Sequence, residues 1–489
     1  MCTDRLILTW NRGCIADVGD IVDALASTAP ALRDAMTSRA YLLSLERRQP
    51  RRRPPFDIET LSSFRDGVLG ATMALIEAEG NELAATFLPH TGIDIVSGSG
   101  LDGVMRVLED VECASVNWDI TAPPSATPSA LLIPSEENTP IDWLTNISNF
   151  QDTFAPLEWY MGGSLRNDVR VGTNFLHVWN DSTVEAEPVR VAILGGGCTT
   201  SISDIQWFTV PQCDIFGTGM EGADCIGWNF YEDSPRLDSK HVTGDLHATL
   251  IASITNKEGF TATCSRCEAF CARITDNDER ARASAVVAAQ DWVFGHGGFK
   301  LLLHQHSFPS DTTAFRMAFD SLHANYHVSV VPAGDTACLL NEGCVSYPAL
   351  YSQHYETVIA VGGSGRAGAR APASNWAPWL DAMAPSVDLM GCATFSCGGF
   401  RVWDGTSGAA ALVTAAIGHT WSLYPRYTAT LWKSALANSS SLINLQNASA
   451  GIVDVKALSE LVELETGGDW PNSGCSRLFA MFPLFGLLI

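Results

Sequence analysis

The sequence predicts an α/β domain with a mostly parallel central sheet covered by helices on both faces, and a small N-terminal α+β domain before it. Short apolar runs at 189–194, 328–331 and 357–361 end in Gly-rich turns, which is typical of buried strands. Stretches with helical spacing, such as 281–294 and 312–324, lie between such runs. Buried strands that alternate with helices predict a parallel sheet with helices on both sides.

Composition divides the rest of the chain. Helical spacing at 20–46 and 57–80, followed by a helix and a strand over 104–118, predicts a separate N-terminal unit. Residues 120–140 are rich in Pro, Ser, Thr and Ala, which is a linker composition. We therefore expect an N-terminal domain at 1–120, a linker at 121–150, the main domain at 151–450 and a C-terminal tail at 451–489.

Charge and hydropathy narrow the class of partner. The formal net charge is −24, which argues against nucleic acid or an anionic membrane as a partner. No apolar run reaches the roughly 20 residues of a membrane span. No secretory signal peptide is visible at the N-terminus. The apolar segment 478–489 is too short to span a membrane, and we interpret it as a frayed tail or as the outline of a lipid-anchor signal.

The chain has 14 cysteines, which neither require nor exclude a disulfide framework. Cys338 with Cys344, and Cys392 with Cys397, are spaced to close small loops, and buried thiols are an equal alternative. Asn-x-Ser/Thr sequons add a preference for an extracellular or secretory location.

A cluster of three cysteines, Cys264, Cys267 and Cys271, is the strongest metal candidate. It lacks a fourth ligand at metal-site spacing, so a disulfide or core thiols are favoured. We expect no metal and no cofactor.

Two residues stand at helix starts where chemistry is favoured. Ser407 lies between small residues and precedes an apolar helix expected over 409–421. The N–H groups and dipole of that helix N-terminus suit a developing oxyanion, although a serine there is also a common N-cap. His247 is followed at once by an apolar helix in the same way.

The order and context of these elements resemble the subtilisin family from about residue 155 to about 425. Gly405-Thr406-Ser407-Gly408-Ala409-Ala410 resembles the block around that family's nucleophile, and His247-Ala248-Thr249 resembles the block around its general base. Further similar blocks occur, in the family's order, at 227–235, 331–335, 346–362 and 383–385. The resemblance implies a three-layer subtilisin-like fold and a serine endopeptidase that cleaves peptides or proteins through an acyl-enzyme. Residues 104–119 resemble the end of a subtilisin propeptide, which implies an intramolecular propeptide.

The resemblance assigns Ser407 as the nucleophile and His247 as the general base, and it identifies a departure at the third triad position. The family's aspartate ends the first core strand, and Gly195 stands there in this chain. Loss of that carboxylate from a subtilisin costs on the order of 10⁴-fold in turnover. Asp204 or Asp214 could replace it, although the family geometry gives no reason for either.

Two further departures affect binding. Asp335 stands where the family has the asparagine that donates to the oxyanion, and an ionised carboxylate can only accept. Ser307, Phe308 and Pro309 align with the strand that pairs with the peptide substrate, and Pro309 has no N–H to donate. The sequence therefore predicts a subtilisin-like serine endopeptidase that is impaired by the missing aspartate. The alternative is an inactive pseudopeptidase that binds peptides or a protein partner through the old groove.

Overall fold

The computed structural model describes the following residues: 5–10, most of 65–109, 114–123, 127–128, parts of 159–178, and 188–466 apart from gaps at 200–201, 211–224, 239–242, 255–259, 262, 297, 342, 393–399 and 441–449. The apolar segment 478–489 and most of the expected linker lie outside these residues.

The centre of the molecule is a seven-stranded sheet in the order β10-β11-β9-β13-β14-β15-β16. Every neighbouring pair in it is parallel, which confirms the predicted parallel sheet. The strands are β9 (Val189–Gly195), β10 (Gly227–Asn229), β11 (Cys267–Arg273), β13 (Phe299–His304), β14 (Val328–Pro332), β15 (Val358–Ser364) and β16 (Ala382–Pro385).

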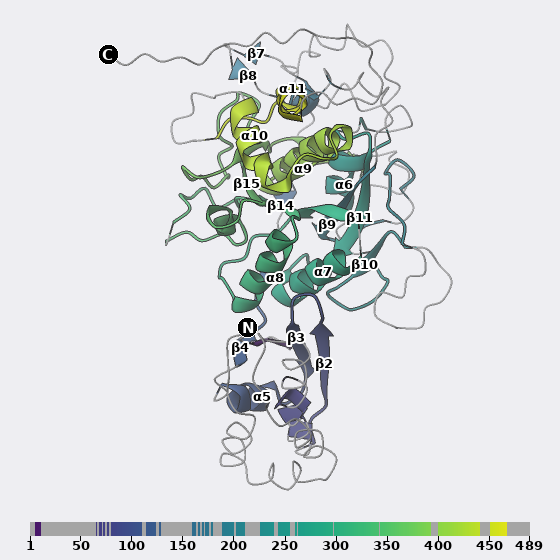
Figure 1. Ribbon diagram of the computed structural model, residues 1–489, viewed down its shortest axis with the longest axis vertical. Helices are drawn as coiled ribbons and strands as arrows, with labels where there is room; N and C mark the ends of the chain where they lie inside the picture. Colours follow the sequence, from purple (N-terminus) through teal and green to yellow (C-terminus); the bar gives the residue numbers. More distant parts are fainter. Residues whose placement is uncertain are drawn as a thin grey trace, which may run out of the picture.

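Helices cover both faces of this sheet (Figure 1). The helices on one face are α6 (Thr243–Ala252), α9 (Thr406–Leu423), α10 (Trp432–Ser439) and α11 (Val455–Thr466), and those on the other are α7 (Ala283–Gly295) and α8 (Thr313–Ala324). Successive strand residues point to opposite faces. In β9, Val191 and Ile193 therefore join the α6/α9 core, while Ala192 and Leu194 join the α7/α8 core.

The N-terminal domain is a four-stranded antiparallel sheet in the order β2-β3-β1-β4 with one helix. Its elements are β1 (Arg5–Trp10), β2 (Leu83–Leu88), β3 (Ile93–Gly98), α5 (Leu101–Leu108) and β4 (Ala114–Trp118). Leu6 and Leu8 pack on one face with α5, whereas Ile7 packs on the other face into the α7/α8 core. The expected small α+β domain is confirmed, and Figure 1 shows it beneath α7 and α8.

Polar contacts join the two domains at the ends of α7. Asp119, which follows β4, accepts from the backbone N–H of Ser284 at 3.0 Å and from its hydroxyl at 2.5 Å. Near the other end, Thr91 donates its backbone N–H to Asp291 at 2.7 Å. A carboxylate at a helix N-terminus satisfies N–H groups that have no partner inside the helix.

The segment after β4 continues along the main domain as two short strands. β5 (Thr121–Ala122) pairs with β12 (Ala281–Arg282). β6 (Thr127–Pro128) pairs with β18 (Phe400–Asp404), which also pairs with β17 (Leu389–Cys392). Part of the expected linker therefore lies on the hairpin that leads into α9.

The main domain reaches further along the chain than the boundary expected at 450. Ile452 forms an isolated β-bridge with Met383, which is a residue of β16. In α11, Val455, Leu458 and Val462 are buried in the α6/α9 core. The segment 451–466 thus packs as part of the domain because its apolar stripe has a partner. The remaining short elements are η3 (Trp159–Met161), β7 (Leu165–Arg166), β8 (Val169–Arg170), η6 (Ala349–Gln353) and η7 (Ala429–Leu431).

Disulfides form at several of the cysteines for which the sequence left two readings open, while Cys397, the expected partner of Cys392, lies outside the described residues. Cys338 pairs with Cys344, and Cys264 with Cys267. Cys271 pairs with Cys198, 73 residues earlier in the sequence. The three cysteines of the rejected metal cluster are therefore all in disulfides.

Candidate active site

The predicted chemical residues converge where strands end and helices begin. Gly195 ends β9, and Asp335 follows β14. His247 lies in the second turn of α6, and Ser407 lies in the first turn of α9. The carboxyl ends of parallel strands meet at one edge of a sheet, where α/β proteins bind their ligands. The fold therefore gathers these residues at one edge.

Ser407 is the second residue of α9 and is only 1% exposed. The close packing around it requires small neighbours. A Cβ atom added to Gly408 would lie 2.1 Å from the Leu389 side chain. Gly405, just before the helix, has a φ of 150°, a region that favours glycine. The small residues around the serine are thus needed for the turn that places it.

His247 is completely buried, and its ring is fixed on one side. Nδ1 lies 2.7 Å from the carbonyl oxygen of Thr243, so Nδ1 carries the proton and donates it. Nε2 is then left as the lone-pair acceptor. The Trp403 ring packs against the imidazole at a centroid distance of 5.7 Å. Burial lowers the pKa of His247 to about 4, and the bond to Thr243 opposes this only in part.

The expected hydrogen bond between Ser407 and His247 is not formed. Among the described residues, Oγ of Ser407 and Nε2 of His247 are both buried without a hydrogen-bond partner. Catalytic hydrogen bonds are often long in the absence of substrate and shorten when it binds. The two groups that proton transfer would join are thus both present and unpaired.

The space beside Gly195, the residue that the sequence resemblance assigns to the aspartate position, is filled by the side chain of Gln305. A Cβ atom added to Gly195 would lie 1.7 Å from Oε1 of Gln305. Gln305 follows β13, the strand beside β9, and its Oε1 accepts from the N–H of Gly196 at 2.9 Å. Sequence reasoning missed this residue, because only the strand order brings it next to Gly195.

Of the two acidic candidates for the missing role, the structure describes Asp204, and it does not lie beside His247. The carbonyl of Asp204 accepts from Ile254, which follows the end of α6. Asp204 therefore lies at the far end of the helix from Thr243, toward which Nδ1 of His247 points. Asp214 lies outside the described residues.

Asp335 caps the helix that carries Ser407. Its carboxylate accepts from the backbone N–H of Thr406 at 2.9 Å and from the Thr406 hydroxyl at 3.1 Å. The same hydroxyl accepts from the N–H of Gly334 at 3.0 Å. Burial raises the pKa of Asp335 to about 6, against the lowering effect of the Thr406 bonds. Asp335 is therefore mostly ionised at pH 7 and acts as an acceptor.

Residues 307–309, which align with the substrate-binding strand, are hydrogen-bonded along one edge to another part of this chain. Phe308 donates its N–H to the carbonyl of Tyr347 at 2.7 Å and accepts from the Tyr347 N–H at 3.0 Å. The Phe308 side chain is 2% exposed and packs edge-on against Phe315. Because backbone groups alternate in direction along an extended chain, the groups of Ser307 and Pro309 face the opposite edge.

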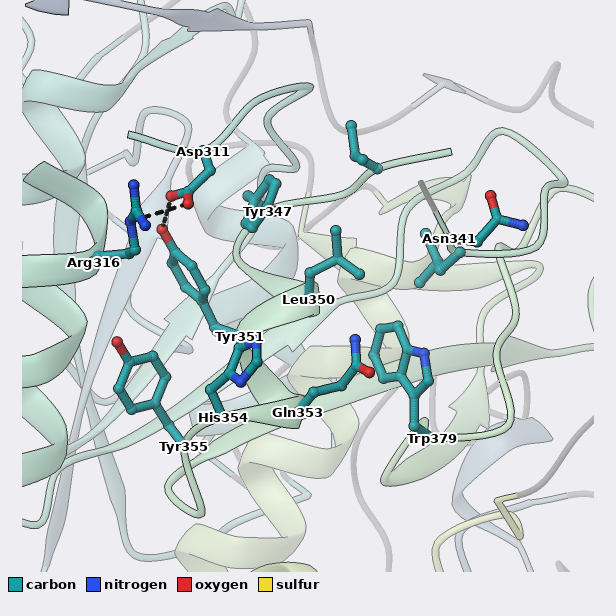
Figure 2. Close-up of a pocket in the computed structure, with 12 residues that line it drawn as sticks. Asp311, Arg316, Asn341, Tyr347, Leu350, Tyr351, Gln353, His354, Tyr355 and Trp379 are labelled. Carbon is teal, nitrogen blue, oxygen red and sulfur yellow. Dashed lines mark hydrogen bonds and ion pairs between the residues drawn. The ribbon is translucent and has the colours of Figure 1, made fainter. Parts of the chain in front are cut away.

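A separate cavity of about 780 Å³ lies beyond Tyr347 (Figure 2). At one end of it the Tyr351 hydroxyl donates to Asp311, which also pairs with Arg316 at 3.1 Å. Among the described residues, none that lines it leaves a buried side-chain polar atom unpaired. The carboxylate of Asp311 is bonded to both Tyr351 and Arg316, so the catalytic candidates remain at the strand ends.

Comparison with known proteins agrees with this geometry. Residues 225–462 match the sequence profile of the subtilase family. Subtilisin DY of Bacillus licheniformis is 25% identical over 275 residues, which cover 56% of this chain and 91% of that protein. Subtilisin-like protease 3 of Pseudogymnoascus destructans is 28% identical over 201 residues, which cover 40% of this chain and 45% of that protein.

A solved structure extends the likeness to the fold of nearly the whole chain. Fervidolysin from Fervidobacterium pennivorans, described as a keratinolytic enzyme related to subtilisin, aligns with a TM-score of 0.60 at 14% identity. The alignment covers 94% of this chain and 61% of that one. The three-layer sheet and the strand-end site fit this likeness: residues 225–462 match the subtilase family, and the chain has a three-layer α/β fold of the subtilisin type.

Proposed function

We propose that this chain cleaves peptide bonds as a serine endopeptidase, with Ser407 as the nucleophile and His247 as the general base, at a rate below that of an intact triad. The observation that carries the proposal is the state of His247. Its Nδ1 proton is held by Thr243, which leaves the Nε2 lone pair available beside the helix that carries Ser407. That is the tautomer needed to accept a serine proton.

The reaction follows from this arrangement. Oγ of Ser407 forms a bond to the scissile carbonyl carbon as its proton moves to Nε2 of His247, and the carbonyl electrons move to oxygen. The imidazolium then returns the proton to the leaving amine, and water hydrolyses the acyl-enzyme by the same steps in reverse. The N–H of Ser407 lies in the first turn of α9, where it has no carbonyl partner within the helix, and it serves as an oxyanion donor.

Asp335 limits the rate in this scheme. It occupies the expected oxyanion position, yet it accepts two bonds from Thr406. As an anion it opposes negative charge that develops next to Ser407, unless it is protonated.

The substrate is a peptide or protein that pairs with the free edge of Ser307–Pro309. That edge offers the N–H and C=O of Ser307 but only the C=O of Pro309. We therefore expect fewer main-chain bonds to substrate than a complete strand would form.

The alternative function is a pseudopeptidase that binds a peptide without cleaving it. The filling of the aspartate position by Gln305 favours it, because a carboxylate cannot enter that space without displacing the glutamine. The two functions differ in whether Ser407 is activated.

The N-terminal domain is proposed to act as an intramolecular propeptide. The Asp119 contact with α7 and the pairing of β6 with β18 support this role, because they lead the chain from that domain to the strand before Ser407. The described disulfides support an extracellular or secretory location, since disulfides persist in oxidising compartments. No described helix is long and apolar enough to cross a bilayer.

A fluorophosphonate probe tests the proposal. We expect the full-length protein, before or after limited proteolysis of its N-terminal region, to be labelled, and Ser407→Ala to abolish labelling. A folded protein that binds peptide but is unlabelled in both states contradicts peptidase function and supports the pseudopeptidase.

A further inference from the structure

A buried carboxyl group from a different part of the chain lies beside the end of β9, next to the position assigned to the missing aspartate. Glu279, in the loop between β11 and β12, is 3% exposed. Its Oε1 accepts from the Thr243 hydroxyl at 2.7 Å. A Cβ atom added to Gly196 would lie 2.7 Å from that oxygen and 1.9 Å from Oγ1 of Thr243. The glycine after Gly195 is therefore what allows this pair to lie against the end of β9.

The loop holds Glu279 in place through local bonds. Asp276 accepts from the N–H groups of Asp278 and Arg280, each at 2.9 Å. The buried Arg273 at the end of β11 donates to Thr275 and to Asn277 in the same loop. Glu279 itself has a φ of 61°, which is unusual for a residue with a Cβ atom. The carboxyl group thus has a fixed position.

Thr243 connects this carboxyl group to the general base. Its hydroxyl donates to Glu279, and its carbonyl accepts from Nδ1 of His247 at 2.7 Å. Nδ1 is the atom that a triad aspartate would hold. One residue therefore lies between the imidazole and the carboxylate, where an intact triad has direct contact.

We propose that Glu279, acting through Thr243, is a positioning residue that takes over part of the role of the missing aspartate. The inference rests on the proposed peptidase function. When Nε2 of His247 receives the Ser407 proton, the ring becomes positive and Nδ1 keeps its own proton. The charge of Glu279 stabilises that imidazolium and polarises Thr243. No proton passes through Thr243 to the carboxylate.

The surroundings of Glu279 determine when it can act. Burial raises the pKa of Glu279 to about 7, while the bonds from Thr243 and the charges of Arg401 and Arg273 lower it. Nε2 of His306 lies 3.3 Å from the Glu279 carbonyl, and burial lowers the pKa of His306 to about 4. Because His306 stays neutral above that pH, the charge of Glu279 should develop across neutrality. Its contribution should therefore grow from acidic to alkaline pH.

If Glu279 only stabilised the fold, it would make the same contacts in the folded protein. Glu279 also sits at the start of α6, where a carboxylate stabilises a helix. Asp245 provides a matched control, because it is a buried carboxyl group on α6, the helix that carries His247. Burial also raises the pKa of Asp245 to about 7. The Asp245 carboxylate accepts from the N–H of Thr199 at 2.8 Å, and no hydrogen bond among the described residues joins it to Thr243 or His247.

The experiment compares fluorophosphonate labelling rates of the full-length protein at pH 6 and pH 9. We expect Glu279→Gln to slow labelling about tenfold at pH 9 and little at pH 6, Glu279→Asp to restore part of the rate, and Asp245→Asn to leave this pH dependence unchanged. Should Glu279→Gln fail to fold, Thr243→Val against Thr243→Ser tests the same link.

The outcomes separate the two proposals. A wild-type protein that is not labelled at either pH contradicts the peptidase function itself. Normal labelling of Glu279→Gln at both pH values, or an equal loss at both, overturns the role of Glu279 while leaving the peptidase function standing.

Discussion

The two halves of the site have diverged in different ways. In the serine half, formed by Asp335 and the first turn of α9, a bond network still ties the end of β14 to the helix through Thr406. In the histidine half, formed by the end of β9 and α6, the position next to the base has been rebuilt with Gln305, Thr243 and Glu279. Under the proposed roles, the nucleophile keeps its framework, while the residues that orient the base differ from those of an intact triad.

The largest effect should come from restoring the histidine half. We expect Gly195→Asp combined with Gln305→Ala to raise kcat/KM by up to about 10⁴-fold, the cost of losing this carboxylate in a subtilisin. Gly195→Asp alone should gain far less, because its Cβ atom would lie 1.7 Å from Oε1 of the buried Gln305. Peptide hydrolysis rates of the single and double variants measure the difference.

Controls for this variant sharpen the comparison. Gln305→Ala alone removes the obstruction without supplying a carboxylate, so it should not raise the rate. Adding Glu279→Gln to the double variant should cost less than in the wild type, because the new aspartate would hold Nδ1 of His247. A double variant no faster than wild type would mean that the defect lies in the serine half.

An intermediate effect is expected in the serine half. Asp335→Asn replaces an acceptor by a side chain that can donate to the oxyanion, and we expect kcat to rise about tenfold or more with little change in KM. The substitution also removes one acceptor from Thr406, which should cost about 1 kcal/mol of stability. Steady-state kinetics together with thermal unfolding test both parts, and a fall in kcat would show that the cap matters more than the donor.

The smallest expected effect concerns stability in acid, away from the reacting groups. His419 in α9 packs edge-on against Phe175 at a centroid distance of 5.2 Å, and burial lowers the pKa of His419 to about 4. Its pKa when unfolded is near 6.5, so the unfolded chain binds more protons between these values and stability falls as the pH falls through that window. His419→Leu should remove roughly 3 kcal/mol of that loss by pH 4.

Unfolding midpoints at pH 7.5 and pH 4.5 check this prediction. The variant should lose less stability than wild type between the two pH values, whatever its stability at pH 7.5. An equal acid loss in both proteins would place the acid-sensitive groups elsewhere, with His247 in the histidine half as the next candidate.

The sequence predicted those features that depend on local pattern. The apolar run at 189–194 indicated a buried strand, and its residues do divide between the two cores. The N-terminal α+β domain was also predicted correctly. The helix α11 was not, because residues 451–489 were assigned to a tail, and only the folded domain supplies the neighbours that cover this helix.

The chemistry of the histidine half depended on strand order and was therefore missed. Gln305 and Glu279 reach the end of β9 only because β13 lies on one side of that strand and β11 on the other. Their sequence positions, more than 80 residues from Gly195, carry no sign of that proximity. The sequence predicted that Gly195 stands at the aspartate position, but it gave no sign that Gln305 fills the space beside it.

The Cys198–Cys271 bond has a consequence for how the site assembles. It closes a ring of chain that contains His247 and Thr243 but excludes Ser407. In the chain-entropy model, closing a ring of that size lowers the entropy of the unfolded chain and so raises its free energy by about 4 kcal/mol. Oxidation therefore restricts the segment that supplies the base before the domain folds. Reduction of the Cys198–Cys271 bond would be expected to loosen that segment.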